Sequence, residues 1–271
     1  MHSYLQLFLG MLFAALIAYA AYRARSLSRS GALGAFIEGS IIFGLGGWQW
    51  AVLLMVFFVS SSALTRLFAK RKASLNEKFD KGGVRDIGQV LANGGVASLF
   101  AGLHFFFPLS SWPWVAFAAS LAAVNADTWS TELGVLNPTD PRLITSFKPV
   151  ERGTSGGISI YGTLAATGGA ALVALVAVLC TPSLGLSAHP ALAWLFTFLI
   201  LSGLAGALFD SLLGATVQAI YRCPHCDKET EKHPLHSCGT PTVQVRGWSW
   251  LNNDLVNLAC ATLGAVVGLI L

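Results

Sequence analysis

Long apolar segments alternate with short polar ones along almost the whole chain. A helix needs about 20 mostly apolar residues to cross the hydrocarbon core of a bilayer, so segments of this kind indicate transmembrane helices. The pattern predicts helices over residues 3–22, 31–47, 49–66, 87–107, 112–132, 157–180, 191–217 and 252–271. Residues 31–66 could instead form one helix with a break at Gly44, Gly46 and Gly47. The sequence therefore predicts an all-α, polytopic membrane protein of about eight transmembrane helices, packed as a single domain over residues 1–271.

The composition agrees with lipid as the solvent. Apolar residues make up 54% of the chain, charged residues only 11%, and the mean hydropathy is +0.64. A soluble globular protein carries about 25% charged residues, so this chain could not cover a water-exposed surface with polar side chains. Basic residues follow the first apolar segment, and no small-residue cleavage site precedes them. We therefore expect a retained helix there and not a signal peptide.

The positions of the Lys and Arg residues predict the orientation of the helices. All 17 lie in the connections after the first, third, fifth and seventh predicted helices, and the connections near 46–49, 108–111 and 181–190 have none. Cytoplasmic loops of membrane proteins carry an excess of Lys and Arg. We therefore expect a multi-pass protein of the inner (plasma) membrane, with both termini outside and the basic face in the cytoplasm. The net charge of +4 then indicates loops beside anionic membrane lipid and no nucleic-acid binding.

Acidic residues occur in several predicted helices, where they are energetically costly. Asp127 and Glu132 lie at the cytoplasmic end of the fifth helix, Asp210 lies in the seventh, and Asp254 opens the eighth. Such residues indicate a function by default, although each could also cap a helix or bond a neighbour, and for Glu38 alone the two interpretations are equal. Carboxylates that converge without matched cations suit Mg²⁺, which prefers a few carboxylates, waters and substrate phosphates. Asp127 and Asp210 are the main candidates.

The connection after the fifth predicted helix has the composition of a phosphate site. A Gly/Ser/Thr-rich turn that leads into a helix presents backbone N–H groups and the positive helix end to an anion. Basic side chains add charge, and Arg can bind phosphate with two parallel hydrogen bonds. The turn is not a Walker sequence and is weak evidence alone, but beside two membrane carboxylates it predicts a phosphate site. Its residues are Lys148, Arg152, Gly153, Thr154, Ser155, Gly156 and Gly157.

Three of the five cysteines share one connection and have the spacing of zinc ligands. Cys223 and Cys226 are followed by His233, His236 and Cys238. Paired cysteines followed by His and Cys ligands are typical of a closed, structural zinc site, and the reducing cytoplasm disfavours a disulfide. We expect Zn²⁺ to be bound by Cys223, Cys226, His236 and Cys238, with His233 as the substitute. The metal would fold residues 222–250 into a small insertion over the cytoplasmic face. Uncoordinated thiols are the alternative.

Several short sequences resemble an integral-membrane family that includes the phytyl-phosphate kinase of the vitamin E pathway. The resemblance covers roughly residues 30–258, and more distantly it extends to dolichol and phytol kinases and to CTP-using cytidylyltransferases. The matching sequences are Ser30-Gly31-Ala32, Arg85-Asp86, Gln89-Val90-Leu91-Ala92-Asn93-Gly94-Gly95, Ala126-Asp127-Thr128-Trp129, Glu132, Leu143-Ile144-Thr145, Gly153-Thr154-Ser155-Gly156-Gly157, Asp210-Ser211-Leu212-Leu213-Gly214-Ala215-Thr216, Gln218, Leu251-Asn252-Asn253-Asp254 and Asn257.

The resemblance implies an enzyme that moves the γ-phosphate of a nucleoside triphosphate, CTP by preference, onto a membrane-embedded isoprenyl monophosphate. Phytyl and geranylgeranyl phosphate are the expected acceptors, and the isoprenyl diphosphate is the product. Asp127 and Asp210 would hold Mg²⁺ with Glu132 or Asp254 as a further ligand, and Lys148, Arg152 and the 153–157 turn would bind phosphates. Nucleotide or acceptor-phosphate contacts are expected from Arg85, Gln89, Asn93, Asn252 and Asn253.

Two other functions fit parts of the pattern. The same scaffold could act as a prenol kinase or as a CTP-dependent nucleotidyltransferase on a lipid; an alcohol acceptor would need a general base, which Asp127 or Asp210 would supply. A membrane transporter could use Asp127, Asp210 and Glu38 as relay carboxylates. Transporters usually bind substrate near the bilayer midplane, whereas the acidic residues here gather toward one face, and a transporter leaves the Gly-rich turn unexplained.

Overall fold

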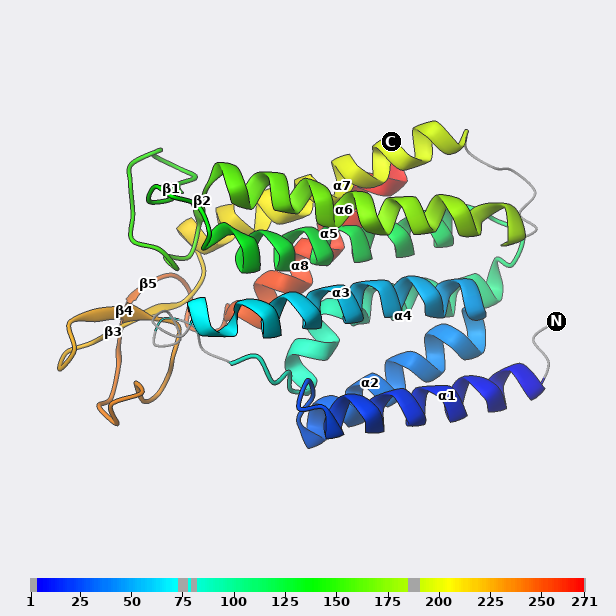
Figure 1. The fold of residues 1–271 in the computed structure, drawn as a ribbon, viewed down its shortest axis with the longest axis horizontal. Helices are drawn as coiled ribbons and strands as arrows, with labels where there is room; N and C mark the ends of the chain where they lie inside the picture. The colour runs from blue at the N-terminus through cyan, green and yellow to red at the C-terminus, as the bar shows by residue number, and fades with distance from the viewer. Residues whose placement is uncertain (1–3, 73–77, 79–81, 185–190, 271) are drawn as a thin grey trace.

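The computed structural model describes residues 4–72, 78, 82–184 and 191–270 (Figure 1). The predicted helices begin at Ser3 and end at Leu271, and one of the 17 basic residues is Lys81. These three residues lie outside the described ranges. The described part contains eight α-helices, as predicted, and their bounds fall within a few residues of the expected ones. They are α1 (Tyr4–Arg23), α2 (Arg29–Ile41), α3 (Trp48–Lys72), α4 (Ile87–Phe106), α5 (Trp112–Gly134), α6 (Ile160–Cys180), α7 (Leu192–Thr216) and α8 (Asn253–Ile270).

The glycine-rich segment before Trp48 forms a break between two helices. A short π-helix, η1 (Ile42–Gly46), continues α2, and Gly47 then adopts a φ of +96°, which favours glycine. Gly46 lies so close to the Trp50 ring that an added Cβ would approach it to 2.5 Å. Of the two alternatives for residues 31–66, the structure therefore has two helices.

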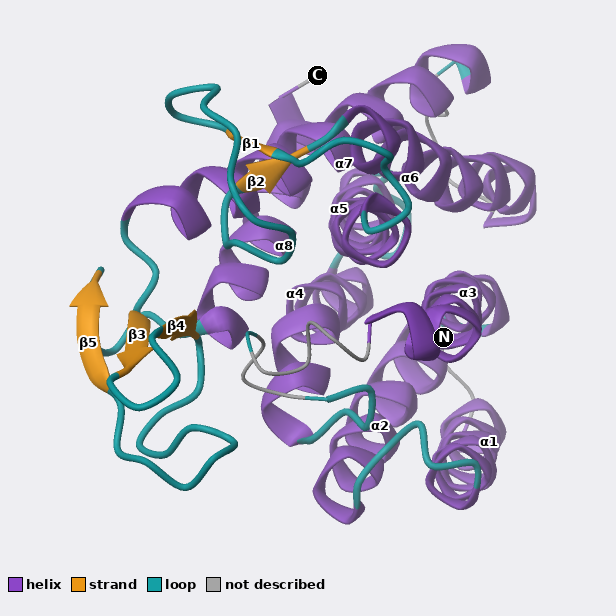
Figure 2. Cartoon of the chain, turned by 60° about the vertical axis from the view of Figure 1, so that its left-hand side comes forward, coloured by secondary structure: helices purple, strands orange, loops and turns teal. Residues whose placement is uncertain are grey.

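Five of the helices, α1, α3, α6, α7 and α8, are long and apolar enough by length and composition to cross a membrane. The central helix α5 is not in this set, because polar residues such as Asp127 and Glu132 make its composition less apolar. It packs against α3, α4, α6, α7 and α8, and its side chains face protein on most sides (Figure 2). Asn125, in the middle of α5, is fully buried and donates from Nδ2 to the carbonyl of Gly169 on α6 at 2.8 Å. A helix shielded in this way tolerates polar residues that lipid would not.

The helices α5, α6, α7 and α8 approach one another closely because small residues line their contacts. A Cβ added to Gly206 of α7, Gly264 of α8 or Gly203 of α7 would meet an alanine Cβ of α5 or α6 at 2.5 Å. Small residues allow membrane helices to pack backbone against backbone. This half of the bundle is therefore fixed by shape, with little room for any larger side chain.

The α1–α2 connection lies nearer the middle of Figure 1, and the basic connections after α5 and α7 lie together at its left-hand end. They include two small sheets that the all-α prediction lacked. In one, β1 (Arg142–Leu143) pairs antiparallel with β2 (Gly157–Ile158); in the other, the order is β4 (Lys228–Thr230), β3 (Ile220–Cys223), β5 (Val243–Arg246), all antiparallel. Strands this short give almost no periodic signal, and here they close a loop and fold the cysteine-containing insertion.

Candidate functional site

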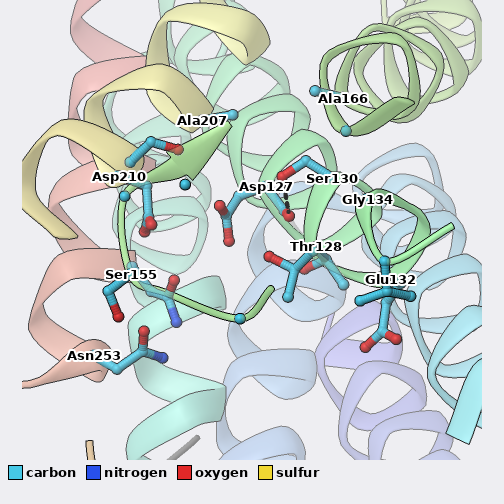
Figure 3. A pocket seen from close by; sticks show the side chains of 18 of the residues that line it. Asp127, Thr128, Ser130, Glu132, Gly134, Ser155, Ala166, Ala207, Asp210 and Asn253 are labelled. Atoms are coloured by element: carbon cyan, nitrogen blue, oxygen red, sulfur yellow. Dashed lines mark hydrogen bonds between the residues drawn. The ribbon is translucent and has the colours of Figure 1, made fainter. Parts of the chain in front are cut away.

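A cavity of about 410 Å³ opens at the end of the bundle where the two small sheets lie. Helices α3 to α8, the loop around 152–158 and one residue of the insertion contribute to its walls, and Figure 3 shows part of it. Most of the predicted site residues line this one cavity. They are Asp127, Asp210, Glu132, Asp254, Arg85, Gln89, Asn93, Arg152, Gly153, Thr154, Ser155, Gly156, Gly157 and Asn253.

Two carboxylates from different helices point into the cavity. Asp127 comes from α5 and Asp210 from α7 (Figure 3), and their like charges repel each other. The Oδ2 atom of Asp210 is buried and has no hydrogen-bond partner among the described residues. Asn253 and Asp254 of α8 line the cavity with them. A set of oxygen donors with an unsatisfied buried carboxylate atom fits a hard divalent cation such as Mg²⁺.

The Gly-rich loop forms part of the cavity wall and is held tightly against α7. Gly156 has a φ of +86°, and a Cβ there would meet Ala215 at 2.5 Å, so no other residue fits this position without displacement. Ser159 caps α6 by accepting from the N–H of Gly162 at 3.1 Å. The loop thus leads into a helix N-terminus at the cavity wall, an arrangement that favours phosphate.

Arg85 lies just before α4, where a short backbone pairing with the α1–α2 connection fixes it. Its N–H donates to Ser26 and its carbonyl accepts from Ser28, and Gly31 packs so closely on that carbonyl that a side chain at position 31 would overlap it. The guanidinium donates from Nη2 to Ser61 Oγ at 2.9 Å. Burial lowers the pKa of Arg85 to about 10, and the nearby Glu132 carboxylate acts in the opposite direction. Arg85 therefore remains a cation at neutral pH.

Gln89 and Asn93 follow Arg85 along α4 at a spacing of four residues and share its face. The Gln89 side chain completes a capping box with Asp86: Asp86 Oδ1 accepts from the Gln89 N–H at 3.0 Å, and Gln89 Oε1 accepts from the Asp86 N–H at 3.2 Å. Asn93 donates from Nδ2 to the Gln89 carbonyl at 2.8 Å. These bonds position the two amides and leave the Gln89 nitrogen and the Asn93 oxygen for other partners.

Glu132 and Glu231 are two further acids of the cavity, and their side chains form hydrogen bonds to other segments of its wall. Glu132, 5% exposed, accepts from Thr65 Oγ1 of α3 at 2.9 Å. Glu231 follows β4, and its Oε1 accepts from Ser155 of the Gly-rich loop and from Gln218, both at 2.8 Å. The sequence did not suggest Glu231, because only the folding of the insertion brings it to the loop.

Two predicted residues do not line the cavity, and a third has other contacts besides. Lys148 is exposed on the outer part of its loop. Asn252 is also exposed, and its Oδ1 caps α8 by accepting from the N–H of Leu255 at 3.1 Å. Arg152 does line the cavity, but it also donates to the carbonyl of Pro138 at 3.1 Å. Capping explains Asn252 without any ligand.

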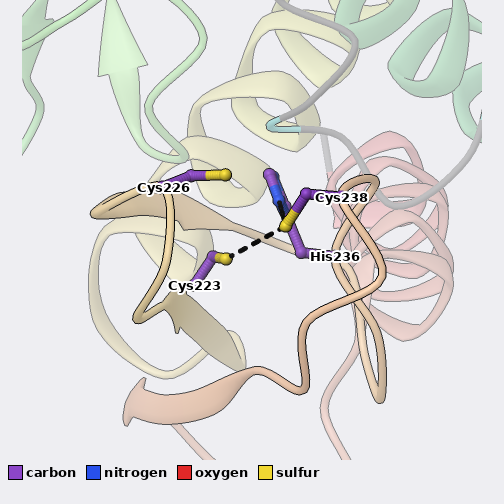
Figure 4. Close-up of side chains that lie close together, drawn as sticks. All are labelled: Cys223, Cys226, His236 and Cys238. Carbon is purple, nitrogen blue, oxygen red and sulfur yellow. Dashed lines mark hydrogen bonds between the residues drawn. The ribbon is translucent and has the colours of Figure 1, made fainter.

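Cys223, Cys226, His236 and Cys238 form a compact cluster in the insertion (Figure 4). Their ligand atoms all lie within 4.8 Å of one another, so the cluster can hold a metal ion such as zinc. Hydrogen bonds with Thr240 and with His236 lower the pKa of Cys238 to about 5, so this thiol is ionised at neutral pH, the form that binds metal.

The other histidine candidate, His233, lies elsewhere. Its ring stacks on Tyr221 at a centroid distance of 4.4 Å and is not part of the cluster. Of the two histidines that the spacing allowed, the structure therefore assigns His236 to the cluster.

The family model of the integral membrane protein family DUF92 matches residues 12–265. The chain belongs to this family. The match begins within α1 and ends within α8, so the cavity walls and the cysteine cluster of this DUF92 protein lie inside it. The protein is thus an integral, multi-pass membrane protein.

Curated relatives of this DUF92 chain occur in a plant and in an archaeon. Protein PGR of Arabidopsis thaliana is 33% identical over 95% of this chain and 93% of its own length. An uncharacterized membrane protein of Methanocaldococcus jannaschii is 30% identical over 100% of this chain and 96% of its own. Protein VTE6, chloroplastic, of Arabidopsis thaliana is 28% identical over 90% of this chain and 65% of its own. No solved structure matches the chain.

Proposed function

We propose that this protein transfers the γ-phosphate of a nucleoside triphosphate, with CTP favoured, to a membrane-embedded isoprenyl monophosphate and releases the isoprenyl diphosphate. The observation that carries the proposal is a single cavity that is lined by an acidic wall, with Asp127 and Asp210, and by a Gly-rich loop and a helix N-terminus. The resemblance to the phytyl-phosphate kinase family and the distant similarity to VTE6 support the same reaction class. We also propose that this end of the bundle faces the cytoplasm, since the basic connections after α5 and α7 lie there.

The acidic wall would hold Mg²⁺ through Asp127 and Asp210, with Asp254 and Glu231 nearby. The bound ion supplies neutralisation of phosphate charge, on which phosphoryl transfer chiefly depends. The loop residues 153–157 and the N-terminus of α6 would bind the donor phosphates through backbone N–H groups. Glu231 keeps Ser155, and with it the loop, in position.

Arg85, Gln89 and Asn93 would bind the acceptor phosphate at the bundle side of the cavity. An acceptor oxygen attacks the γ-phosphorus, the bond from that phosphorus to the bridging oxygen of the β-phosphate breaks, and the nucleoside diphosphate leaves. A phosphate monoester is largely dianionic at pH 7, because its second pKa is about 6. The reaction therefore needs no general base to create the nucleophile.

Product analysis tests the proposal. The purified protein in lipid nanodiscs is supplied with geranylgeranyl or phytyl monophosphate, Mg²⁺, and each nucleoside triphosphate in turn, labelled either at the γ-phosphate or in the base. We expect γ-label in the isoprenyl diphosphate and none of the base. Base label in the lipid would instead establish a nucleotidyltransferase, labelling of the free prenol but not of its monophosphate would establish a prenol kinase, and no label in any lipid would refute the proposal.

A further inference from the structure

A second cavity, of about 90 Å³, lies between α1, α2, α3 and α4. Its walls are almost entirely hydrocarbon and include Ala18 of α1, Phe43 of η1, Met55 of α3 and Val90 of α4. Three residues line both cavities: Arg85, which lies just before α4, and Gln89 and Asn93 on one face of that helix. The polar cavity and the apolar cavity therefore meet along one row of polar side chains.

Arg85 lies at the boundary between the two cavities and contacts both kinds of surface. Its guanidinium carbon lies 5.6 Å from the ring centroid of Phe57 and 5.9 Å from that of Phe58, and both rings line the apolar cavity. Its Nη2 is bonded to Ser61. An amphipathic ligand with an anionic head could thus pair with Arg85 while its adjoining hydrocarbon lies beside the two rings.

The apolar cavity has an exit toward the surface of the bundle. Phe13 and Ile17 of α1 line it and are 45% and 37% exposed, whereas Ala14 and Ala18 on the same helix are 7% and 5% exposed. Helix α1 packs mainly on α2 and η1, while α3 packs on α5, η1 and α6 (Figure 2). The side of the cavity between α1 and α3 therefore opens where membrane helices face lipid.

We propose that the apolar cavity binds the hydrocarbon segment next to the phosphate of the acceptor lipid, with the phosphate at Arg85, Gln89 and Asn93. This inference rests on the proposed function and specifies how its lipid substrate is held. A cavity of about 90 Å³ is smaller than one of about 150 Å³ that holds a benzene molecule. It therefore has room for about one isoprene unit, and the rest of the chain leaves between α1 and α3 into the bilayer.

Photo-crosslinking tests the position of the tail without turnover. Two probes are used, geranylgeranyl monophosphates that carry a diazirine in the first isoprene unit or at the far end of the chain. We expect the first probe to label residues of α1 to α4 that line the apolar cavity, and the second to label bilayer lipid. Labelling of α5 to α8 by the first probe would overturn the inference. Absence of diphosphate in the parent protein would contradict the proposed function separately, because crosslinking needs no reaction.

Filling the cavity gives a second test. Ala51→Phe places a ring in the cavity, and the matched control Val52→Phe adds the same bulk at the next residue, which is 38% exposed and does not line it. We expect Ala51→Phe to reduce labelling and raise KM for geranylgeranyl monophosphate about tenfold or more, because the ring displaces carbon atoms of the substrate from the cavity, while KM for the nucleotide stays unchanged.

If Ala51→Phe does not fold, Met55→Ala should raise the same KM, because it removes apolar contacts from the cavity wall. Unchanged KM and labelling in the folded variants would refute the inference.

Discussion

The two halves of the bundle enclose different spaces. Helices α5 to α8 meet through glycine and alanine at backbone distance, as at Gly206 against Ala123, and they provide Asp127 and Asp210. Helices α1 to α4 also meet through small residues in places, as at Gly10 against Gly44, but they leave an apolar cavity between them. The difference suggests a division of labour, in which one half fixes charged groups for chemistry and the other accommodates a hydrocarbon chain.

The largest effect on activity is expected from substitution of the two aspartates, Asp127 and Asp210. Asp127→Asn and Asp210→Asn should each lower phosphoryl transfer on the order of 10²- to 10³-fold, because each removes a charge that would hold Mg²⁺ against the phosphates. Thermal stability should stay the same or rise, since in the absence of metal the substitution removes repulsion between two carboxylates. Activity and melting temperature measured on the same preparations check both expectations.

A control comes from Glu229 of β4, an acid that is exposed and lies outside the cavity. Glu229→Gln should leave transfer unchanged. Full activity in Asp127→Asn or Asp210→Asn would remove the metal assignment, and a large loss of stability in either would show that the carboxylate supports the fold instead.

The cysteine-containing insertion should have the next largest effect on activity. Cys223→Ser should abolish zinc binding, because the cluster loses a thiolate ligand. Glu231 is then no longer held at Ser155, and loss of a hydrogen bond to a charged group, about 1.5–3 kcal/mol, corresponds to a fall in transfer of about tenfold or more. Elemental analysis for zinc and hydrogen exchange over residues 220–246 provide the measurements.

The control for this experiment is Cys180→Ala, which removes a thiol of α6 that lies outside the cluster. It should retain zinc and activity. A parent protein that contains no zinc, or a Cys223→Ser variant with unchanged exchange in the insertion, would contradict the structural role of the metal.

The apolar pattern predicted the helices well because lipid leaves a chain few alternatives. Each buried backbone polar group needs a partner within the segment, so helix positions follow directly from hydropathy. Even the break at Gly47 had a signal, since three glycines precede Trp48. The short strands had none, because β1 and β2 are only two residues long each, too short for a periodic pattern.

The cavity residues were predicted from their type and from their common depth in the predicted helices. The structure places Asp127, Asp210 and Arg85 in the lining of one cavity. Depth does not say which way a side chain points. Asn252 turns to cap its own helix, and Lys148 stays in water. Glu231 belongs to a segment whose path depends on the cysteine cluster and its sheet, so its position beside Ser155 had no local signal.

Local packing predicts opposite results for two glycine substitutions. Gly206→Ala should destabilise the protein by roughly 1–3 kcal/mol, because the added methyl group would approach Ala123 to 2.5 Å and the Cys260 carbonyl to 3.0 Å. Gly95→Ala on α4 should stabilise by up to about 1 kcal/mol, since nothing lies within 4 Å of the new methyl group and alanine favours helix. Thermal unfolding in detergent compares them, and equal effects would show that the close helix contact at Gly206 does not limit the side chain there.

The smallest expected effect concerns Glu38, an acid that belongs to the apolar half. It is 4% exposed, packs against Gly94 of α4, lines the apolar cavity and does not line the polar one. Its Oε1 has no hydrogen-bond partner among the described residues, so an uncharged amide of the same shape should be tolerated. Glu38→Gln should therefore change kcat less than about threefold, in contrast to Asp127→Asn. A loss as large as that of Asp127→Asn would place Glu38 in the chemistry or in an ion relay through the bundle, and would break the division between a catalytic half and a lipid-binding half.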